Sequence, residues 1–135
     1  MVCELLLIAI MAVETGGCQN PLEAEGDYWN GQYNSIGCMQ IQKCVIEDVN
    51  RVYKTNFIPE DRLKQGASFR IARLYLEYWG KHYEKKTGNK ATNEILARIW
   101  NGGAYGWKKT GKAKANLDKY WSKVKRELER EVENG

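Results

Sequence analysis

One carboxylate stands where it could act as a general acid. Glu14 ends the apolar run Ile8 to Val13 and is followed at once by Thr15-Gly16-Gly17. Burial of a carboxyl beside apolar side chains tends to raise its pKa and to keep it protonated near neutral pH, the state that a general acid needs. The same pattern also fits a solvated glutamate in the last turn of a core helix. Glu14 taken alone therefore leaves both interpretations open.

Two further clusters carry amide side chains beside glycines. The first is Gly37-Cys38-Met39-Gln40, and the second is Trp100-Asn101-Gly102-Gly103. The amides of Gln40 and Asn101 each offer hydrogen-bond donors and an acceptor that a polar ligand could use. Helix capping and loop bracing are the structural alternatives for both residues.

Helices predicted from apolar spacing would position these clusters. The expected helices are Val2–Glu14, Met39–Tyr53, Ala67–Lys86, Asn93–Trp100 and Lys114–Glu133. Thr92 is the expected N-cap of the fourth helix, and Asn101-Gly102-Gly103 is expected to end it. Asn30-Gly31 would suit the turn of a small β-hairpin. The sequence therefore predicts a mostly α fold with a small β-hairpin.

Length and composition predict one domain without a membrane span. The 135 residues are enough for a single core, with 1–125 as the domain and 126–135 as a charged helix end. The first 13 residues lack a basic start and are too short for a span. We expect them to form a core helix. Any export signal is then expected to be missing from this sequence, or the protein leaves its cell by another route.

The charge distribution favours an anionic partner. The formal net charge is +4, and such an excess steers association without naming the partner. The basic residues gather late in the chain, at Lys108, Lys109, Lys112, Lys114, Lys119, Lys123, Lys125 and Arg126. A solvated basic helix is the alternative. A basic helical nucleic-acid module is a weaker alternative and no nucleic-acid partner is predicted, because these residues are not interleaved with a recognisable nucleic-acid-binding motif.

The four cysteines predict disulfides or buried thiols rather than a metal site. Cys3, Cys18, Cys38 and Cys44 contain no CxxC pair, and the single histidine, His82, lies far away in the sequence. Three pairings are open for four cysteines, and the sequence does not choose among them. His82 is expected to be a core or rim histidine. No metal and no cofactor are predicted.

The clusters, in this order, resemble the lysozyme-like superfamily, in particular soluble lytic transglycosylases and the goose-type and invertebrate-type lysozymes. In that family a hydrophobic helix ends in Glu-Ser, a G-L-M-Q segment opens the next core helix, and an A-Y-N-type turn follows. This chain has Glu14-Thr15, Gly37-Cys38-Met39-Gln40 and Trp100-Asn101, and a later Tyr-x-x-x-Val is matched by Tyr120 to Val124. Thr15 replaces Ser, Cys38 replaces Leu, and Trp100 replaces the usual Tyr. The matches span Ile8 to Val124.

The resemblance implies a lysozyme-like α+β domain that cleaves the β-1,4 bond between MurNAc and GlcNAc in peptidoglycan, with Glu14 as general acid. Asp27 would be the second carboxylate of a hydrolytic mechanism, with Glu23 and Glu25 as further candidates. A role as a turn residue is the alternative for Asp27. A lytic transglycosylase would need Glu14 alone, because the 6-hydroxyl of the substrate closes a 1,6-anhydro ring.

The resemblance also implies a set of substrate contacts. These are Thr15, Tyr33, Gln40, Trp100, Asn101 and Tyr120, and aromatic rings such as those of Tyr28, Trp29, Tyr105 and Trp107 could stack on sugar faces. We expect a monomer that is secreted, periplasmic or phage-associated. A non-catalytic glycan-binding protein on the same fold is the alternative from another class.

Overall fold

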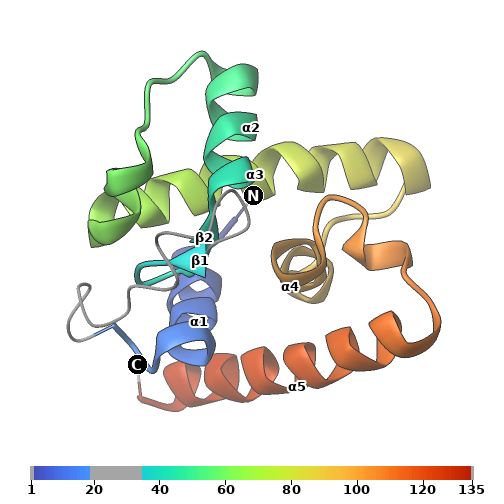
Figure 1. Ribbon diagram of the computed structural model, residues 1–135. Coiled ribbons are helices and arrows are strands. Elements are labelled where there is room, and N and C mark those ends of the chain that lie inside the picture. The colour runs from blue at the N-terminus through green and yellow to red at the C-terminus, as the bar shows by residue number, and fades with distance from the viewer. Residues whose placement is uncertain (1, 19–34, 135) are drawn as a thin grey trace. The chain divides into compact units, whose positions relative to one another are not determined.

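A computed structural model describes residues 2–18 and 35–134, and these residues are mostly helical (Figure 1). The elements, in chain order, are α1 (Glu4–Thr15), β1 (Ser35–Ile36), β2 (Ile41–Gln42), α2 (Lys43–Tyr53), the short 3₁₀ helix η1 (Pro59–Leu63), α3 (Gln65–Thr87), α4 (Asn93–Gly102), a second 3₁₀ helix η2 (Gly106–Lys108) and α5 (Gly111–Asn134). The prediction of a mostly α fold with a small hairpin is confirmed.

The hairpin lies just after the segment in which it was expected. β1 and β2 pair antiparallel, with Ser35 opposite Gln42 and Ile36 opposite Ile41. The predicted turn Asn30-Gly31 lies outside the described residues. A four-residue turn, 37–40, joins the strands, and Gly37 and Gln40 both have positive φ angles, +81° and +51°. The backbone N–H of Gln40 closes the turn on the carbonyl of Gly37 at 3.0 Å.

The prediction of a helix from Met39 is therefore wrong at its start. Met39 and Ile41 are buried, but Met39 lies in the turn and Ile41 lies in β2. Helix α2 begins only at Lys43. A short apolar segment has the same composition in a buried hairpin as in a buried helix. The Gly37-to-Gln40 segment is thus a turn that precedes the helix.

The end of α4 also differs from expectation. Asn101 and Gly102 are still helical, and the helix ends at Gly103, whose φ is +87° and whose N–H donates to the carbonyl of Ile99 at 2.9 Å. Gly102 packs against Leu117, so that the absence of a side chain there serves helix packing. The N-cap prediction is confirmed, because the Thr92 hydroxyl accepts the N–H of Ile95.

Contacts divide the chain into two compact units, which are described separately. The first comprises Met1–Ile10 and Leu76–Gly135, and the second comprises Met11–Tyr75. They are called the terminal unit and the hairpin unit below.

The core of the hairpin unit gathers apolar residues from α1, the hairpin, α2 and α3. Its buried members include Met11, Ile36, Cys38, Met39, Ile41, Ile46, Val49, Ile71, Ala72 and Tyr75. The loop after α2 is braced by Asn50, whose side chain donates to the carbonyl of Phe57 and accepts from Thr55 and from the N–H of Phe57. These hydrogen bonds fix the loop that connects α2 to η1.

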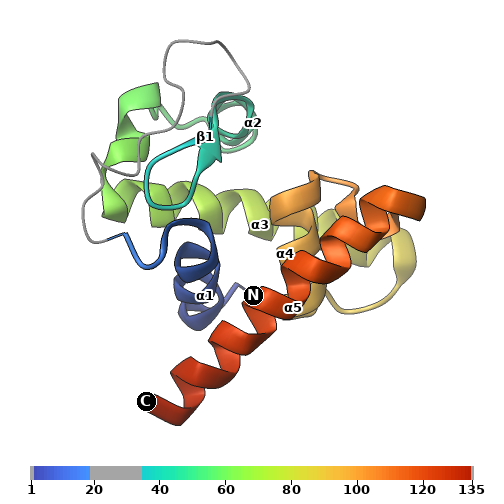
Figure 2. The same ribbon diagram turned by 60° about the horizontal axis from the view of Figure 1, so that its bottom comes forward.

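In the terminal unit, α4 packs against α5 (Figure 2). Buried residues include Leu6, Leu7, Leu76, Tyr83, Leu96, Ala97, Ile99, Leu117, Tyr120 and Val124. Arg98 on α4 joins the two helices, because its guanidinium lies 3.0 Å from Glu94 and 2.8 Å from Asp118 on α5. The hydrogen bond from Arg98 lowers the pKa of the Asp118 carboxyl.

Substitution of Gly37 tests the close approach on which the turn depends. A Cβ at Gly37 would overlap the carbonyl oxygen of Arg62, whereas a Cβ at Gly16, which also has a positive φ, would meet nothing within 4 Å. Gly16→Ala should cost only the left-handed backbone penalty of about 1 to 2 kcal/mol. Gly37→Ala should lower the free energy of unfolding by at least about 3 kcal/mol. Denaturant unfolding of both variants measures the difference, and equal losses would contradict the steric explanation.

Tyr75 makes the stability of the fold sensitive to alkaline pH. Its side chain is 8% exposed, and desolvation by burial, with a smaller contribution from the charge of Asp48, raises its pKa from 10.0 to about 12. The unfolded chain therefore loses this proton first, so the stabilisation is complete below pH 10 and declines as the pH rises towards 12.

We expect the free energy of unfolding of the wild type to fall between about pH 9 and about pH 11 by about 1 kcal/mol more than that of Tyr75→Phe. Urea titrations at the two pH values give the comparison. Any constant loss caused by removing the hydroxyl cancels in the difference. Identical declines in the two proteins would show that Tyr75 does not titrate in this way.

Candidate active site

Glu14 lies in the last turn of α1 and its side chain is half-buried. The helix ends directly after it, because Gly16 and Gly17 have φ angles of +67° and +101°, which favour glycine. The N–H of Gly16 still donates to the carbonyl of Ala12 at 2.9 Å. The carboxylate thus stands at a defined helix end rather than within a flexible run of chain.

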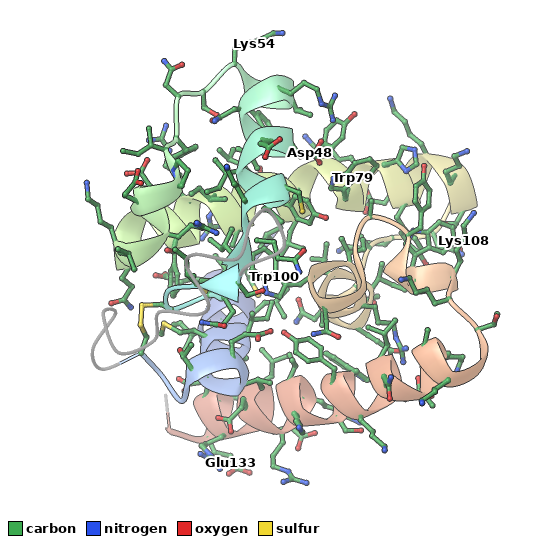
Figure 3. All side chains as sticks on the ribbon, in the orientation of Figure 1. Asp48, Lys54, Trp79, Trp100, Lys108 and Glu133 are labelled. Atoms are coloured by element: carbon green, nitrogen blue, oxygen red, sulfur yellow. A yellow bond between two sulfur atoms is a disulfide. The ribbon has the colours of Figure 1, made fainter. Side chains whose placement is uncertain are left out.

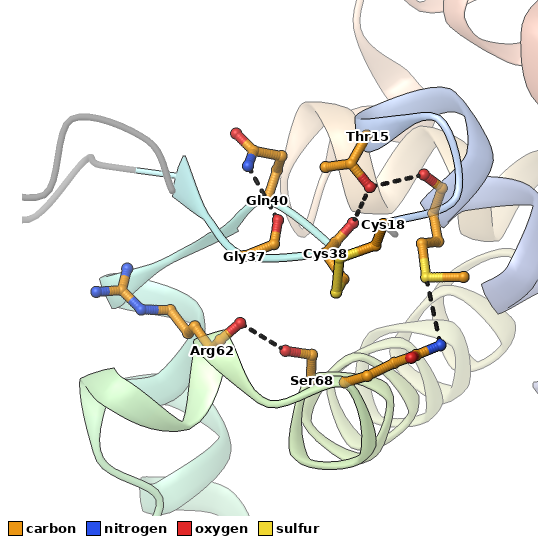
Figure 4. The surroundings of a disulfide bond; sticks show 9 residues. Thr15, Cys18, Gly37, Cys38, Gln40, Arg62 and Ser68 are labelled. Carbon is orange, nitrogen blue, oxygen red and sulfur yellow. Dashed lines mark hydrogen bonds between the residues drawn. A yellow bond between two sulfur atoms is a disulfide. The ribbon is translucent and has the colours of Figure 1, made fainter. Parts of the chain in front are cut away.

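Thr15 ties this helix end to the hairpin turn (Figure 4). Its hydroxyl oxygen lies 2.9 Å from the carbonyl of Cys38 and 3.2 Å from the carbonyl of Met11. The single hydroxyl proton can serve either acceptor. Serine would present the same hydroxyl, so the conservative replacement noted in the sequence keeps this contact available. The position next to Glu14 is therefore held by a side-chain hydrogen bond to another element.

A disulfide reinforces the same junction. Cys18, three residues after Thr15, is bonded to Cys38, and the two Cα atoms lie 5.0 Å apart. Both residues are buried. Cys3 and Cys44 are exposed and carry free thiols. Of the three pairings left open by the sequence, the structure contains one bond and leaves the other two cysteines unbonded.

Gln40 uses its side chain to brace the turn. Its Nε2 donates to the carbonyl of Gly37 at 3.0 Å, the same carbonyl that accepts its backbone N–H. This is the bracing role that the sequence left open as an alternative to substrate binding. Gln40 is half-buried and lies in the same unit as Glu14 and Thr15. The structure thus brings Thr15 and Gln40 to one turn.

Arg62 is a buried cation beneath this turn that the sequence interpretation missed. It is 4% exposed, and its guanidinium donates to the carbonyls of Pro59 and Ile41 at 2.8 and 3.0 Å. Its own carbonyl accepts the hydroxyl of Ser68 at 2.9 Å and is the group that Gly37 approaches. Nothing in the spacing around Arg62 distinguishes it from a surface residue.

The other predicted site residues lie in the terminal unit or outside the described residues. Trp100, labelled in Figure 3, is half-buried near the end of α4, and Asn101 beside it is exposed. Tyr120 on α5 is only 8% exposed. Asp27 and Tyr33 lie outside the described residues, as do Glu23 and Glu25.

Aromatic rings, including that of Trp79, form a cluster beside Lys108 in the terminal unit (Figure 3). The His82 ring stands edge-on to Trp79 and Tyr105, with centroids 5.2 and 5.5 Å away. The Nζ of Lys108 lies 4.9 Å from the centre of the Tyr105 ring. Within the described chain the buried Nδ1 of His82 has no hydrogen-bond partner. The prediction of a core or rim histidine is confirmed by its packing among these rings.

A cavity of about 380 Å³ in the same unit contains none of the predicted site residues. Its walls are formed by Val2, Leu76, Glu77, Gly80, Lys81, Glu84, Ala91 and Leu96. Within residues 2–18 and 35–134, no three histidine, cysteine or carboxylate side chains are grouped so that they could hold a metal ion. No helix in that part of the chain is long and apolar enough to cross a membrane.

Comparison with known proteins gives no family assignment. No protein-family model matches this chain, and no curated protein matches it. The functional assignment therefore depends on the residues themselves and on the resemblance noted in their order.

The disulfide predicts the number of reactive thiols and a contribution to the free energy of unfolding. The denatured, unreduced protein should react with two equivalents of a thiol reagent, and the reduced protein with four. Replacing Cys18 and Cys38 together by alanine should lower the free energy of unfolding by about 3 kcal/mol, because the bond restricts the unfolded chain. The matched control, Cys3→Ser with Cys44→Ser, should change it by less than about 1 kcal/mol. Four reactive thiols before reduction would contradict the pairing.

Proposed function

We propose that this protein is a muramidase that cleaves the β-1,4 bond between MurNAc and GlcNAc in peptidoglycan, with Glu14 as the general acid. The observation that carries the proposal is the position of Glu14. It is a half-buried carboxylate in the last turn of α1, and the next residue is tied to the hairpin turn by the Thr15 hydroxyl. A general acid must be held within hydrogen-bond reach of the oxygen that it protonates.

The resemblance to the lysozyme-like superfamily supports the choice of substrate. The residues that it implies for sugar contacts are Thr15, Tyr33, Gln40, Trp100, Asn101 and Tyr120. The half-buried ring of Trp100 and the exposed amide of Asn101 have the chemistry for stacking and for hydrogen bonding to an amino sugar.

The proposed reaction begins with proton transfer. The Glu14 carboxyl donates its proton to the glycosidic oxygen, the bond from C1 of MurNAc to that oxygen breaks, and GlcNAc leaves with a free 4-hydroxyl. The MurNAc ring is left with oxocarbenium character. In hydrolysis, Asp27 either helps a water to attack C1 and takes its proton, or attacks C1 itself and is then displaced by a water whose proton passes to the Glu14 carboxylate. Both routes give a reducing end. In transglycosylation, the 6-hydroxyl attacks C1 and returns its proton to the Glu14 carboxylate.

The proposed setting is outside the cytosol. Structural disulfides persist in oxidising compartments, and the Cys18–Cys38 bond joins the two segments that hold the candidate acid. A secreted, periplasmic or phage-associated monomer that acts on the cell wall without a cofactor is consistent with this chemistry.

Digestion of purified peptidoglycan tests the proposal. Glu14→Gln should lower the rate of product release by about 10² to 10⁴-fold, because the amide cannot donate an acidic proton. Glu4→Gln is the matched control, since Glu4 is an exposed glutamate in the first turn of the same helix. It should leave the rate within about twofold of the wild type. Undiminished release by Glu14→Gln would overturn the assignment.

Mass analysis of the products separates the alternatives. Reducing-end muropeptides indicate hydrolysis, and then Asp27→Asn should also lose activity. Anhydro-muropeptides indicate transglycosylation, and then Asp27→Asn should remain active. Binding to peptidoglycan without any products would instead favour a non-catalytic glycan-binding protein.

A further inference from the structure

Helix α5 carries a row of cations along one face. Their spacing, at every third, fourth or seventh residue, places them within about 60° of arc at 100° per residue, and the row extends over about 27 Å of helix. The members of this basic stripe are Lys112, Lys119, Lys123, Arg126 and Arg130. All five are exposed.

The stripe is exposed, and among the described residues only one of its five cations, Arg130, has an ion-pair partner. Lys112, Lys119, Lys123 and Arg126 form no ion pair with any residue that the structure describes, and Arg130 lies 3.6 Å from Glu127. Asp118, which could have opposed the lysines, is paired with Arg98 and Lys114 on another face of the helix.

The buried side of α5 determines that the stripe faces solvent. Leu117, Tyr120 and Val124 are buried, and α5 packs against α4 through this side (Figure 2). The stripe therefore remains on the solvent side of the helix while the apolar side is occupied.

Helix stability does not account for this arrangement. The helix dipole favours acidic residues in the first turn, at its positive end, and basic residues in the last turn, at its negative end. The first turn of α5 contains no acidic residue and its last turn contains no basic one. The acidic residues Glu127, Glu129, Glu131 and Glu133 instead occupy the C-terminal part. The charge order opposes the dipole, so the dipole does not explain the position of these cations.

We propose that the basic stripe of α5 binds an anionic polymer of the cell wall, namely a flexible chain of phosphodiester-linked polyols. Such a chain can lie along a straight row of cations and release its counterions as it does so. The assignment to the wall depends on the proposed function, whereas the binding itself does not require cleavage.

Two other anionic surfaces fit the stripe less well. A helix that binds a membrane buries an exposed apolar face in the lipid. Leu117, Tyr120 and Val124 of α5 are already buried in the protein, and the exposed Val132 stands between Glu131 and Glu133. Nucleic-acid readers place amide or aromatic side chains among their cations. Among residues 111–133 of α5, Asn116 is the only exposed amide, and no aromatic ring is exposed.

Binding of poly(glycerol phosphate) to the full chain tests the proposal. The stripe variant is Lys112→Glu, Lys119→Glu and Lys123→Glu. The control is Lys85→Glu, Lys86→Glu and Lys90→Glu, which changes the same number of exposed lysines in the same unit. We expect the stripe variant to lose more than about tenfold in affinity, and its log–log salt slope to fall by about 2, at about 0.7 per phosphate contact. The control should lose much less on both measures, and circular dichroism should show unchanged helix content in both variants.

Duplex DNA and vesicles that contain phosphatidylglycerol are the comparison probes. Equal losses in the two variants, or none in either, would overturn the stripe as the binding surface. Tighter binding to DNA or to vesicles than to poly(glycerol phosphate) would overturn the choice of polymer. Digestion of polymer-free peptidoglycan by the stripe variant reports separately on the proposed cleavage. Failure of one proposal therefore leaves the other measurable.

Discussion

The approach of Gly37 to the carbonyl of Arg62 is the constraint on which the hairpin unit depends. It places the turn directly over η1, where the buried guanidinium of Arg62 holds the carbonyl of Ile41 on β2. Because the turn is fixed there, the carbonyl of Cys38 is available to Thr15. The position of the end of α1, and with it that of Glu14, thus follows from a contact that leaves no room for a side chain.

The sequence predicted the elements whose signals are long. α3 and α5 extend over more than five turns, and α1 is apolar almost throughout, so their periodicity or composition is clear. Met39 and Ile41 were assigned to a helix because burial alone does not distinguish a short strand from a helix. The sequence pattern favours a helix end at Gly102, because the packing of Gly102 against Leu117 depends on a residue distant in the sequence.

The candidate site was predictable to a similar extent. Glu14 and Thr15 stand out because an apolar run stops at them. Gln40 stands out because its amide follows shortly after Gly37, in a segment that resembles the family's G-L-M-Q. Arg62 gave no such signal, since its burial results from the folding of η1 beneath the hairpin. The pairing of Cys18 with Cys38 likewise depends on which chain ends meet in space. Both units therefore rely on buried or bridging charges, Arg62 in one and Arg98 in the other, that local sequence patterns do not reveal.

The Cys18–Cys38 bond also changes what a break in the chain would mean. It closes a covalent ring that contains every residue from 18 to 38. A protease that cuts one peptide bond inside this ring opens the ring but does not separate the products. Glu14 and the residues after Cys38 would remain parts of one molecule. The disulfide would still join the segments that carry Thr15 and Cys38. A chain cut within the ring therefore keeps its covalent connection at this junction.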